Sequence, residues 1–333
     1  MPACLWALLF AGMLATCVLV GAWTEPAKGA FPGTNGKLVV AARDTVSDDT
    51  EIFTMNPNGT GVVQLTHNKT YDDEPAWSPD GKKIAYSHLT QTDDWEIVVM
   101  RADGTQKTQV TDSPQRNADP TWSPNGRRIA FMSTRDVATD RSDFNANIYS
   151  VRSDGTDTRQ LTKNTATDLM PDWSPDGTKI AFYTTRYDEN TSEIAVMHRD
   201  GSNVRRVTYT TGLPGDEKFF SESYPDWSPS GRRIAYQLYT NIYTIRADGT
   251  GVKKLTNADD DFFSQEGSSC PAWSPDGKKI AFCGTRVIGI DPILGEETYE
   301  RGIYLINSDG SSEKKISGPD HVTALDWQRL PAQ

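Results

Sequence analysis

The chain has 333 residues, of which 45 are Asp or Glu and 34 are Lys or Arg, so its formal net charge at pH 7 is −11. A nucleic-acid-binding protein needs a basic surface against phosphate, and this charge balance argues against such a partner. Apolar residues make up 36% of the chain. They are enough for a large core, either in two ordinary domains or in one large all-β unit.

The chain begins with an apolar segment that has no charged side chain before Glu25. Small residues at Val20-Gly21-Ala22 provide a signal peptidase site, so we predict a signal peptide over residues 1–22 and a short linker over 23–30. The segment is also nearly long enough for a membrane anchor, and lipidation of Cys17 is a further alternative. In each case the rest of the chain is predicted to be periplasmic, associated with the cell envelope or secreted. This segment provides its only membrane association.

A twelve-residue phrase, PAWSPDGKKIAY at residues 75–86, returns in four further copies along the chain. The tryptophans of the five copies are 45, 51, 54 and 46 residues apart, at Trp77, Trp122, Trp173, Trp227 and Trp273. This spacing is close to the ~40 to 50 residues of one propeller blade. A row of exposed tryptophans could bind sugars, but a Trp at a fixed place beside β-forming residues favours packing between blades.

Each copy predicts four antiparallel strands in a meander. An apolar stretch around Trp77 meets a Ser-Pro-Asp-Gly turn, and the alternating run 83–86 follows it. A second run at 96–100 leads to an Asp-Gly turn and a short last strand that ends in Val-Thr. Asp-Gly sequences favour hairpins because glycine accepts the positive φ that tight turns require.

The two ends of the chain indicate how the ring closes. The Asp-Gly or Asn-Gly turn before the last strand occurs six times, whereas the full Trp phrase occurs five times. Residues 35–40 match the second half of the phrase, and residues 325–327 match its first half. We therefore predict an all-β, six-bladed, monomeric propeller over residues 31–328, with a tail over 329–333. The C-terminal strand completes the first blade in a 1 + 3 closure, which leaves no unpaired edge.

The phrase WSPDGKKIAY, followed by EIVVMRADGT and a terminal Leu-Thr or Val-Thr, resembles the TolB-type, WD-like propeller repeat of secreted bacterial proteins. The resemblance covers residues 31–328 and implies the propeller fold. It says less about function, because this fold carries binding proteins and enzymes alike. TolB also has a smaller α/β domain before its propeller. About ten residues separate the targeting segment from the first blade here, so the resemblance is expected to cover the propeller portion only.

The meander sorts the connections into two faces. The Ser-Pro-Asp-Gly and Asp-Gly turns share one face, here called the turn face, and the remaining loops share the other, here called the variable face because their lengths differ. Loops that vary among regular repeats usually carry the interaction. The candidate partner-binding residues are the acidic residues of that face: Asp72, Asp73, Glu74, Asp93, Asp94, Asp188, Asp216, Glu217, Asp259, Asp260, Asp261, Glu296 and Glu297.

These features predict a non-catalytic binding or scaffold propeller. Its acidic loop-rich face would engage a protein or other cell-envelope component, and an acidic surface favours a cationic partner. The alternative reading of the charge is that solvated loops are simply acidic. The sequence does not identify the partner.

Enzyme and metal alternatives remain open at this point. The chain contains no GxSxG elbow, HExxH pair, P-loop or paired-cysteine zinc pattern. A propeller-based polysaccharide lyase, or another small-substrate enzyme, is the alternative function. His67, His88 and His321 are predicted to lie on the variable face and are weak metal candidates. We expect no cofactor, with calcium at Asp259-Asp260-Asp261 as the exception to consider.

Two cysteines, Cys270 and Cys283, lie outside the targeting segment. An exported chain makes a disulfide between them a candidate. If the turn pairs Trp273 with Ile280, strict alternation places the two cysteines directly opposite each other on neighbouring strands. Two free buried thiols are the alternative.

Overall fold

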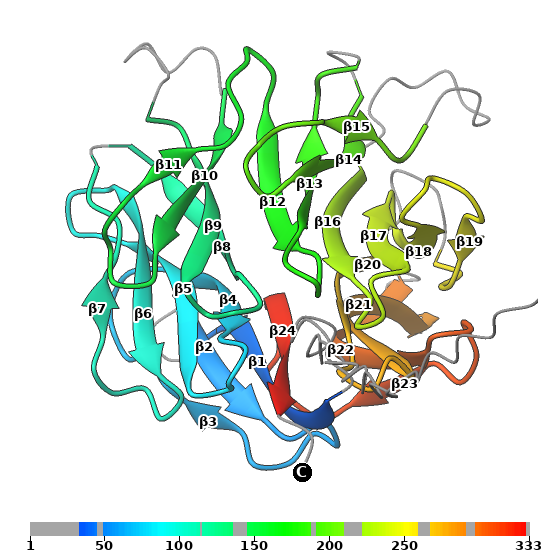
Figure 1. The fold of residues 1–333 in the computed structure, drawn as a ribbon. Coiled ribbons are helices and arrows are strands. Elements are labelled where there is room, and N and C mark those ends of the chain that lie inside the picture. The colour runs from blue at the N-terminus through cyan, green and yellow to red at the C-terminus, as the bar shows by residue number, and fades with distance from the viewer. Residues whose placement is uncertain are drawn as a thin grey trace, which may run out of the picture.

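The computed structural model describes residues 33–44, 49–113, 115–135, 145–187, 191–209, 222–258, 267–290 and 297–330. Within these ranges it contains 24 strands and no helix, arranged as six four-stranded sheets around a central axis (Figure 1). No helix among these residues is long and apolar enough to cross a membrane. The predicted all-β, six-bladed propeller is confirmed.

The blades follow one another along the chain. Blade 1 consists of β24 (Val322–Leu330), β1 (Thr34–Arg43), β2 (Thr50–Met55) and β3 (Val63–Gln64). Blade 2 consists of β4 (Asp72–Trp77), β5 (Lys83–Leu89), β6 (Trp95–Arg101) and β7 (Thr108–Gln109). Blade 3 consists of β8 (Asn117–Trp122), β9 (Arg128–Ser133), β10 (Asn147–Arg152) and β11 (Arg159–Gln160).

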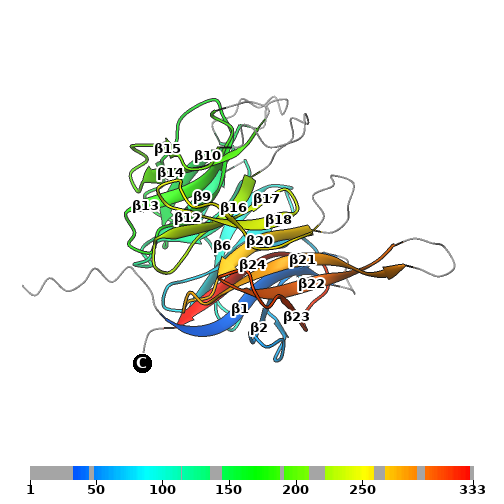
Figure 2. The same ribbon diagram turned by 90° about the vertical axis from the view of Figure 1, so that its right-hand side faces the viewer.

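The second half of the ring is built the same way. Blade 4 consists of β12 (Asp168–Trp173), β13 (Lys179–Thr184), β14 (Glu193–His198) and β15 (Arg205–Arg206). Blade 5 consists of β16 (Glu222–Trp227), β17 (Arg233–Leu238), β18 (Asn241–Arg246) and β19 (Lys253–Lys254). Blade 6 consists of β20 (Gly267–Trp273), β21 (Lys279–Ile290), β22 (Glu297–Asn307) and β23 (Lys314–Ile316). Its β21 and β22 extend beyond the ring as a long hairpin (Figure 2).

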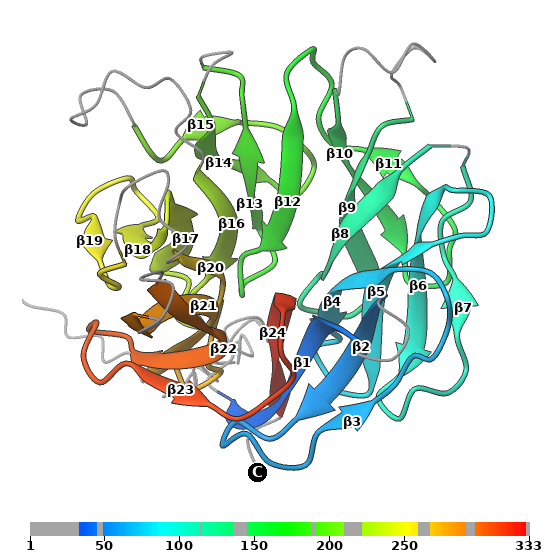
Figure 3. The same ribbon diagram turned by 180° about the vertical axis from the view of Figure 1, so that it is seen from behind.

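The ring closes through its two ends. The C-terminal β24 pairs antiparallel with β1, with Trp327 opposite Leu38 and Leu325 opposite Val40. Figure 3 shows these two strands side by side. The predicted 1 + 3 closure is therefore confirmed, although β24 continues to Leu330, two residues past the predicted end of the propeller.

The repeated phrase forms the turns and the contacts between blades. In blade 2, the Ser78 hydroxyl donates to Asp80 Oδ1 at 2.8 Å and accepts from the Lys83 N–H at 2.8 Å, which closes the turn. Gly81 adopts a φ of 66°, which glycine accepts readily. Trp122 packs in one buried cluster with Ile97 and Val99 of the preceding blade. The interpretation of the tryptophans as packing residues is confirmed.

A β-bulge interrupts each innermost strand of blades 2 to 6, just before the Trp. The residue before the proline has a positive φ in each case, at Glu74, Asp119, Met170, Tyr224 and Cys270. Proline cannot donate to the sheet, and an extra residue in one strand bends it locally. The bulge therefore breaks the alternation that the sequence suggested.

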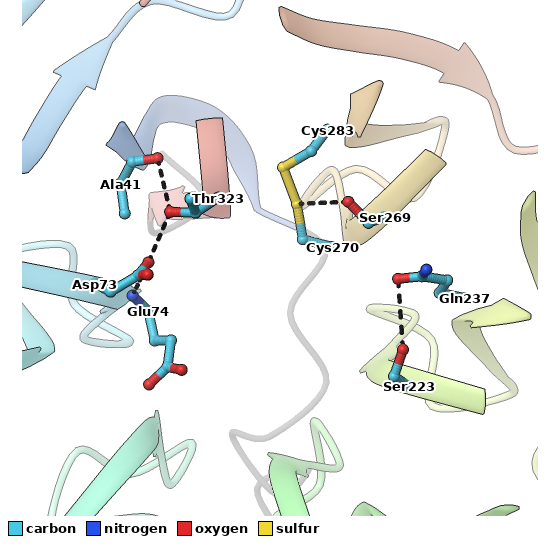
Figure 4. Close-up of a disulfide and its surroundings, with 9 residues drawn as sticks. All are labelled: Ala41, Asp73, Glu74, Ser223, Gln237, Ser269, Cys270, Cys283 and Thr323. Atoms are coloured by element: carbon cyan, nitrogen blue, oxygen red, sulfur yellow. Dashed lines mark hydrogen bonds between the residues drawn. A yellow bond between two sulfur atoms is a disulfide. The ribbon is translucent and has the colours of Figure 1, made fainter. Parts of the chain in front are cut away.

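The cysteine pair shows the effect of the bulge on register. Cys283 lies opposite Ser269, and Cys270 lies within the bulge that follows. The predicted register, with Cys270 directly opposite Cys283, is wrong because it assumed strict alternation. The two residues are nevertheless joined by a disulfide, with Cα atoms 5.8 Å apart (Figure 4).

We expect this disulfide to be measurable in the purified protein. Titration of the mature chain in denaturant without reductant should find no free thiol. Replacing both cysteines by serine should lower the free energy of unfolding by about 3 kcal/mol, since the bond closes a short loop of the unfolded chain. Two free thiols in the non-reduced protein would contradict the bond.

Candidate functional site

The innermost strands of the six blades surround a cavity of about 160 Å³ on the propeller axis. This cavity is called the channel here, and its end nearer the variable face is called the channel mouth. Each of these strands runs from the variable face to the turn face, so two of its positions form rings at different depths. The outer ring, nearer the variable face, comprises Glu74, Asp119, Met170, Tyr224, Cys270 and Ala324. The inner ring comprises Ala76, Thr121, Asp172, Asp226, Ala272 and Asp326.

Side chains of the outer ring connect each blade to the next. Glu74 Oε2 accepts a hydrogen bond from the Asp119 N–H at 2.8 Å, and Asp119 Oδ2 accepts from the Met170 N–H at 3.2 Å. The Met170 sulfur accepts from the Tyr224 N–H at 3.4 Å. The bulge makes this chain of contacts geometrically available, because it turns the backbone N–H of each residue toward the preceding blade.

Three aspartates of the inner ring also connect blades, by hydrogen bonds to the backbone of a tryptophan in another blade. The Asp172 carboxyl accepts a hydrogen bond from the backbone N–H of Trp227 at 2.7 Å, and the Asp226 carboxyl accepts one from the backbone N–H of Trp273 at 2.6 Å. Asp326 accepts from the Trp77 N–H at 2.7 Å, across the ring closure. Each of these hydrogen bonds joins one blade to another, so the carboxyls help to fix neighbouring blades.

Burial raises the pKa of two carboxyls at or near the outer ring, Asp73 and Asp119. Burial raises the pKa of Asp73 to about 6, and the nearby Glu74 carboxylate adds to the shift. Burial and Glu74 together also raise the pKa of Asp119 well above its usual range. Arg116 lies near this group and opposes both shifts, with its guanidinium 3.9 Å from Glu74 Oε1.

The three aspartates of the inner ring also have raised pKa values, and one arginine lies near all of them. Burial raises the pKa of Asp172 to about 6. Burial and the Asp172 charge raise the pKa of Asp226, and burial raises that of Asp326. Arg329, from the end of β24, lines the cavity and opposes all three shifts. The described lining therefore contains five carboxyl groups and one guanidinium. Two of the carboxyls belong to the outer ring, Glu74 and Asp119, and three to the inner-ring aspartates.

The predicted acidic residues do not form one surface. Asp72 is wrongly predicted as a loop residue: it is fully buried in β4, where it bonds His88 Nδ1 and the Asn68 amide, each at 2.6 Å. Asp73 and Glu74 also lie in β4, beside the channel, and Asp73 accepts a hydrogen bond from the Thr323 hydroxyl (Figure 4).

Asp93 and Asp94 lie in the turn between β5 and β6, and Glu297 is exposed at the start of β22. The remaining predicted residues lie outside the described part of the chain. They are Asp188, Asp216, Glu217, Asp259, Asp260, Asp261 and Glu296.

The three histidine candidates are held in separate surroundings. His67 is exposed, His88 contacts Asp72, and His321 Nδ1 lies 3.3 Å from a guanidinium nitrogen of Arg301. Among the residues that the structure describes, no three His, Cys, Asp or Glu side chains are placed to hold a metal ion together.

Sequence reasoning missed four carboxyls that lie inside the repeated phrase or directly before it. Asp119 stands directly before the proline of its copy, and Asp172, Asp226 and Asp326 stand directly before a Trp. The signal was present, because these are the positions of the phrase that vary between copies while Pro and Trp hardly change. Treating the whole phrase as architecture hid them.

Comparisons with known proteins agree with this architecture. Residues 200–293 match the family model of the dipeptidyl peptidase IV (DPP IV) N-terminal region. A TolB homolog of Chlorobium luteolum is 30% identical over 114 residues, which cover 33% of this chain and 24% of that protein. The match therefore spans about a quarter of the relative's length.

Two solved structures show how widely the fold is used. TolB from Acinetobacter baumannii superposes with a TM-score of 0.67 at 18% identity, covering 90% of this chain and 67% of that one. An oligogalacturonate lyase from Vibrio parahaemolyticus superposes with a TM-score of 0.53 at 14% identity, covering 84% and 79%. At these identities the superpositions show the fold alone. Together with the repeated phrase, they show that the chain is a six-bladed β-propeller whose repeats are similar to those of TolB.

Proposed function

We propose that the chain is a non-catalytic, exported binding propeller that engages a cationic protein segment of the cell envelope at the mouth of its channel. The resemblance to TolB supports an envelope location and a protein partner. The observation that carries the proposal is the gathering of carboxyls around the cavity, with Asp73 beside it. Most of the acidic loops first considered lie outside the described residues, so the channel mouth is the part of the variable face on which the proposal rests.

The charge of the channel favours a cation over other ligands. The raised pKa values of Asp73, Asp119 and Asp172 mean that these buried carboxyls resist ionisation. A lysine or arginine side chain entering the channel would stabilise their charged forms. A cavity of about 160 Å³ is below the ~300 Å³ of ordinary small-molecule sites, which suits one extended side chain better than a sugar ring.

Binding of a cation should therefore depend on pH. Asp73 and Asp172 have pKa values of about 6, so they are mostly protonated below that pH and mostly ionised above it. We expect affinity for a cationic peptide to rise severalfold between pH 5 and pH 7 and then to level off. Titrations at fixed ionic strength measure this dependence, and equal affinity at the two pH values would contradict it.

A polysaccharide lyase is the second candidate, because an oligogalacturonate lyase shares the fold. Its substrates are anionic, and the carboxyls of the channel would repel a uronate chain. None of the three variable-face histidines lies among the residues that line the cavity. Incubation with polygalacturonate, followed by ultraviolet absorbance of the unsaturated product, would detect this activity.

Capture from a cell-envelope extract tests the proposed function. The bait is the full mature propeller at about 50 mM salt, with washes at about 500 mM, because salt screens exposed charge pairs. We expect a partner that high salt releases and that a Glu74→Gln/Asp119→Asn variant captures less well. The exposed-turn variant Asp93→Asn/Asp94→Asn serves as a charge-matched control and should capture normally. Salt-insensitive capture, or none, would count against the proposal.

A further inference from the structure

A second cavity lies away from the axis, where blades 5, 6 and 1 meet at the variable face. Its volume is about 230 Å³. Blade 5 contributes the end of β17 and the β17–β18 connection. Blade 6 contributes the beginning of β20 and the middle parts of β21 and β22, and blade 1 contributes the start of β24. The disulfide separates it from the channel, since Cys283 lines this cavity and Cys270 lines the channel.

The described lining of this peripheral cavity is basic, whereas that of the channel is acidic. No carboxylate occurs among its described lining residues, whereas Arg301 and His321 both line it. Two acidic side chains of blade 6 are paired within the blade: Glu313 with Arg286 at 2.8 Å and Glu300 with Lys315 at 3.1 Å. The exposed Asp320 directly precedes His321 in the chain but does not line the cavity. Through Arg301, the described lining of this cavity is cationic, on a chain whose net charge is −11.

The contact between Arg301 and His321 determines which of their nitrogen atoms can donate a hydrogen bond to a ligand. An arginine only donates hydrogen bonds, so His321 Nδ1, 3.3 Å from the guanidinium, accepts. The neutral imidazole then carries its proton on Nε2, as a second donor. Both side chains are exposed, and neither forms an ion pair with a carboxylate in the described part of the chain.

Hydroxyl and amide groups make up much of the remaining lining. Thr240, Ser268, Ser269 and Thr285 provide hydroxyls, of which the Ser268 hydroxyl also accepts from the Arg286 guanidinium at 2.9 Å. The Gln237 amide lines the cavity and is held by donating to the Tyr239 carbonyl at 2.8 Å and accepting from the Ser223 hydroxyl at 3.4 Å. Figure 4 shows Gln237 of blade 5 and Ser269 of blade 6 on the same side of the disulfide. A guanidinium beside several neutral donors and acceptors matches a ligand with one carboxylate and several hydroxyls.

We propose that this cavity binds a small sugar acid, with the ligand carboxylate on Arg301 and its hydroxyls on the threonine and serine side chains. At about 230 Å³ this cavity is larger than the axial cavity of about 160 Å³, and one monosaccharide is the largest sugar that we assign to it. The site is independent of the cationic partner proposed for the channel, because it lies on the other side of the disulfide and has the opposite charge.

Calorimetric titration with D-glucuronate and with D-glucose tests this site on the full mature chain. The two sugars differ in the carboxylate, so we expect saturable binding of glucuronate and at least tenfold weaker binding of glucose. Arg301→Gln should weaken glucuronate binding at least tenfold. The matched control Arg101→Gln, at an exposed position on the turn face, should leave it unchanged.

The fold of each variant is verified by its thermal melt, and Arg301 is exposed, so its replacement should not unfold the protein. Equal affinity for the two sugars, or full affinity in the Arg301 variant, would overturn the role of the guanidinium. Absence of saturable binding of either sugar would overturn the site. The channel proposal would be untouched by these outcomes, since its tests use cationic probes.

Discussion

Deleting residues 320–333 is expected to abolish cooperative folding of the propeller. The deletion removes β24, which pairs along β1 and packs against β4, and with it the buried side chains of Trp327 and Leu325. Blade 1 would keep three strands, and both its inner edge and the adjoining core would be exposed to water. Thermal melting followed by circular dichroism measures the effect.

Two further measurements separate loss of closure from a general effect of truncation. Trp327→Ala keeps the strand but removes a side chain that is 2% exposed, and should cost about 3 to 5 kcal/mol. A synthetic peptide of residues 320–330, added to the truncated chain, should restore a melting transition by adding the missing strand. A truncated protein with an unchanged melting temperature would show that the ring does not close through β24.

Glu222→Gln is expected to stabilise the protein at neutral and alkaline pH. Glu222 and Glu193 meet in the seam between blades 4 and 5, where both are almost fully buried. Burial raises the pKa of Glu222 from the ordinary 4.5 to about 8, and the Glu193 carboxylate adds to the shift. Glu193 is bonded to Arg206 and accepts from the Thr208 hydroxyl at 2.8 Å, so Glu222 is the carboxyl that holds the proton.

The direction of the pH effect follows from the raised pKa. The folded protein binds a proton that the unfolded chain releases, so this contribution to stability is complete below about pH 4.5 and is lost as pH rises toward 8. At about 1.4 kcal/mol per pH unit, the cost at pH 7 amounts to a few kcal/mol. A glutamine can still accept from the Ile194 N–H and donate to Glu193 without titrating.

Urea unfolding at pH 5, 7 and 9 compares the variant with the wild type. We expect the stability difference between them to grow with pH up to about 8 and then level off. Glu193→Gln is the informative counterpart, because it leaves Arg206 without its carboxylate partner and should not stabilise the fold. A difference between Glu222→Gln and wild type that does not change with pH would contradict a shared proton in this seam.

The fold was predictable from the sequence because the turns, the strands and the spacing of the blades each leave a recurring pattern in the chain. Asp-Gly turns, alternating runs such as 83–86 and regular Trp spacing all indicate four-stranded blades. The half-phrases at residues 35–40 and 325–327 indicate the closure. The bulges were not predicted, since period-two alternation contains no sign of an extra residue. The register of Cys270 was therefore wrong although its partner was correctly chosen.

The candidate site was harder to predict than the fold. Asp72, Asp73 and Glu74 form one acidic run in the sequence, yet the strand buries Asp72 against His88 and places Glu74 on the channel. Whether a carboxyl faces solvent, a neighbour or the axis depends on the bulge and on the next blade. Asp172 and Asp226 lie 54 residues apart in the chain and become neighbours only when blades 4 and 5 pack against each other.

Tetralysine titration against the intrinsic tryptophan fluorescence tests the central claim, that the channel mouth recognises a cation. Trp77, Trp122, Trp173 and Trp327 line the cavity and report its occupancy. We predict saturable binding that weakens at least tenfold in Glu74→Gln/Asp119→Asn and is unchanged in the charge-matched Asp93→Asn/Asp94→Asn. Absence of saturable binding, or an equal loss in both variants, would contradict a cation site at the channel.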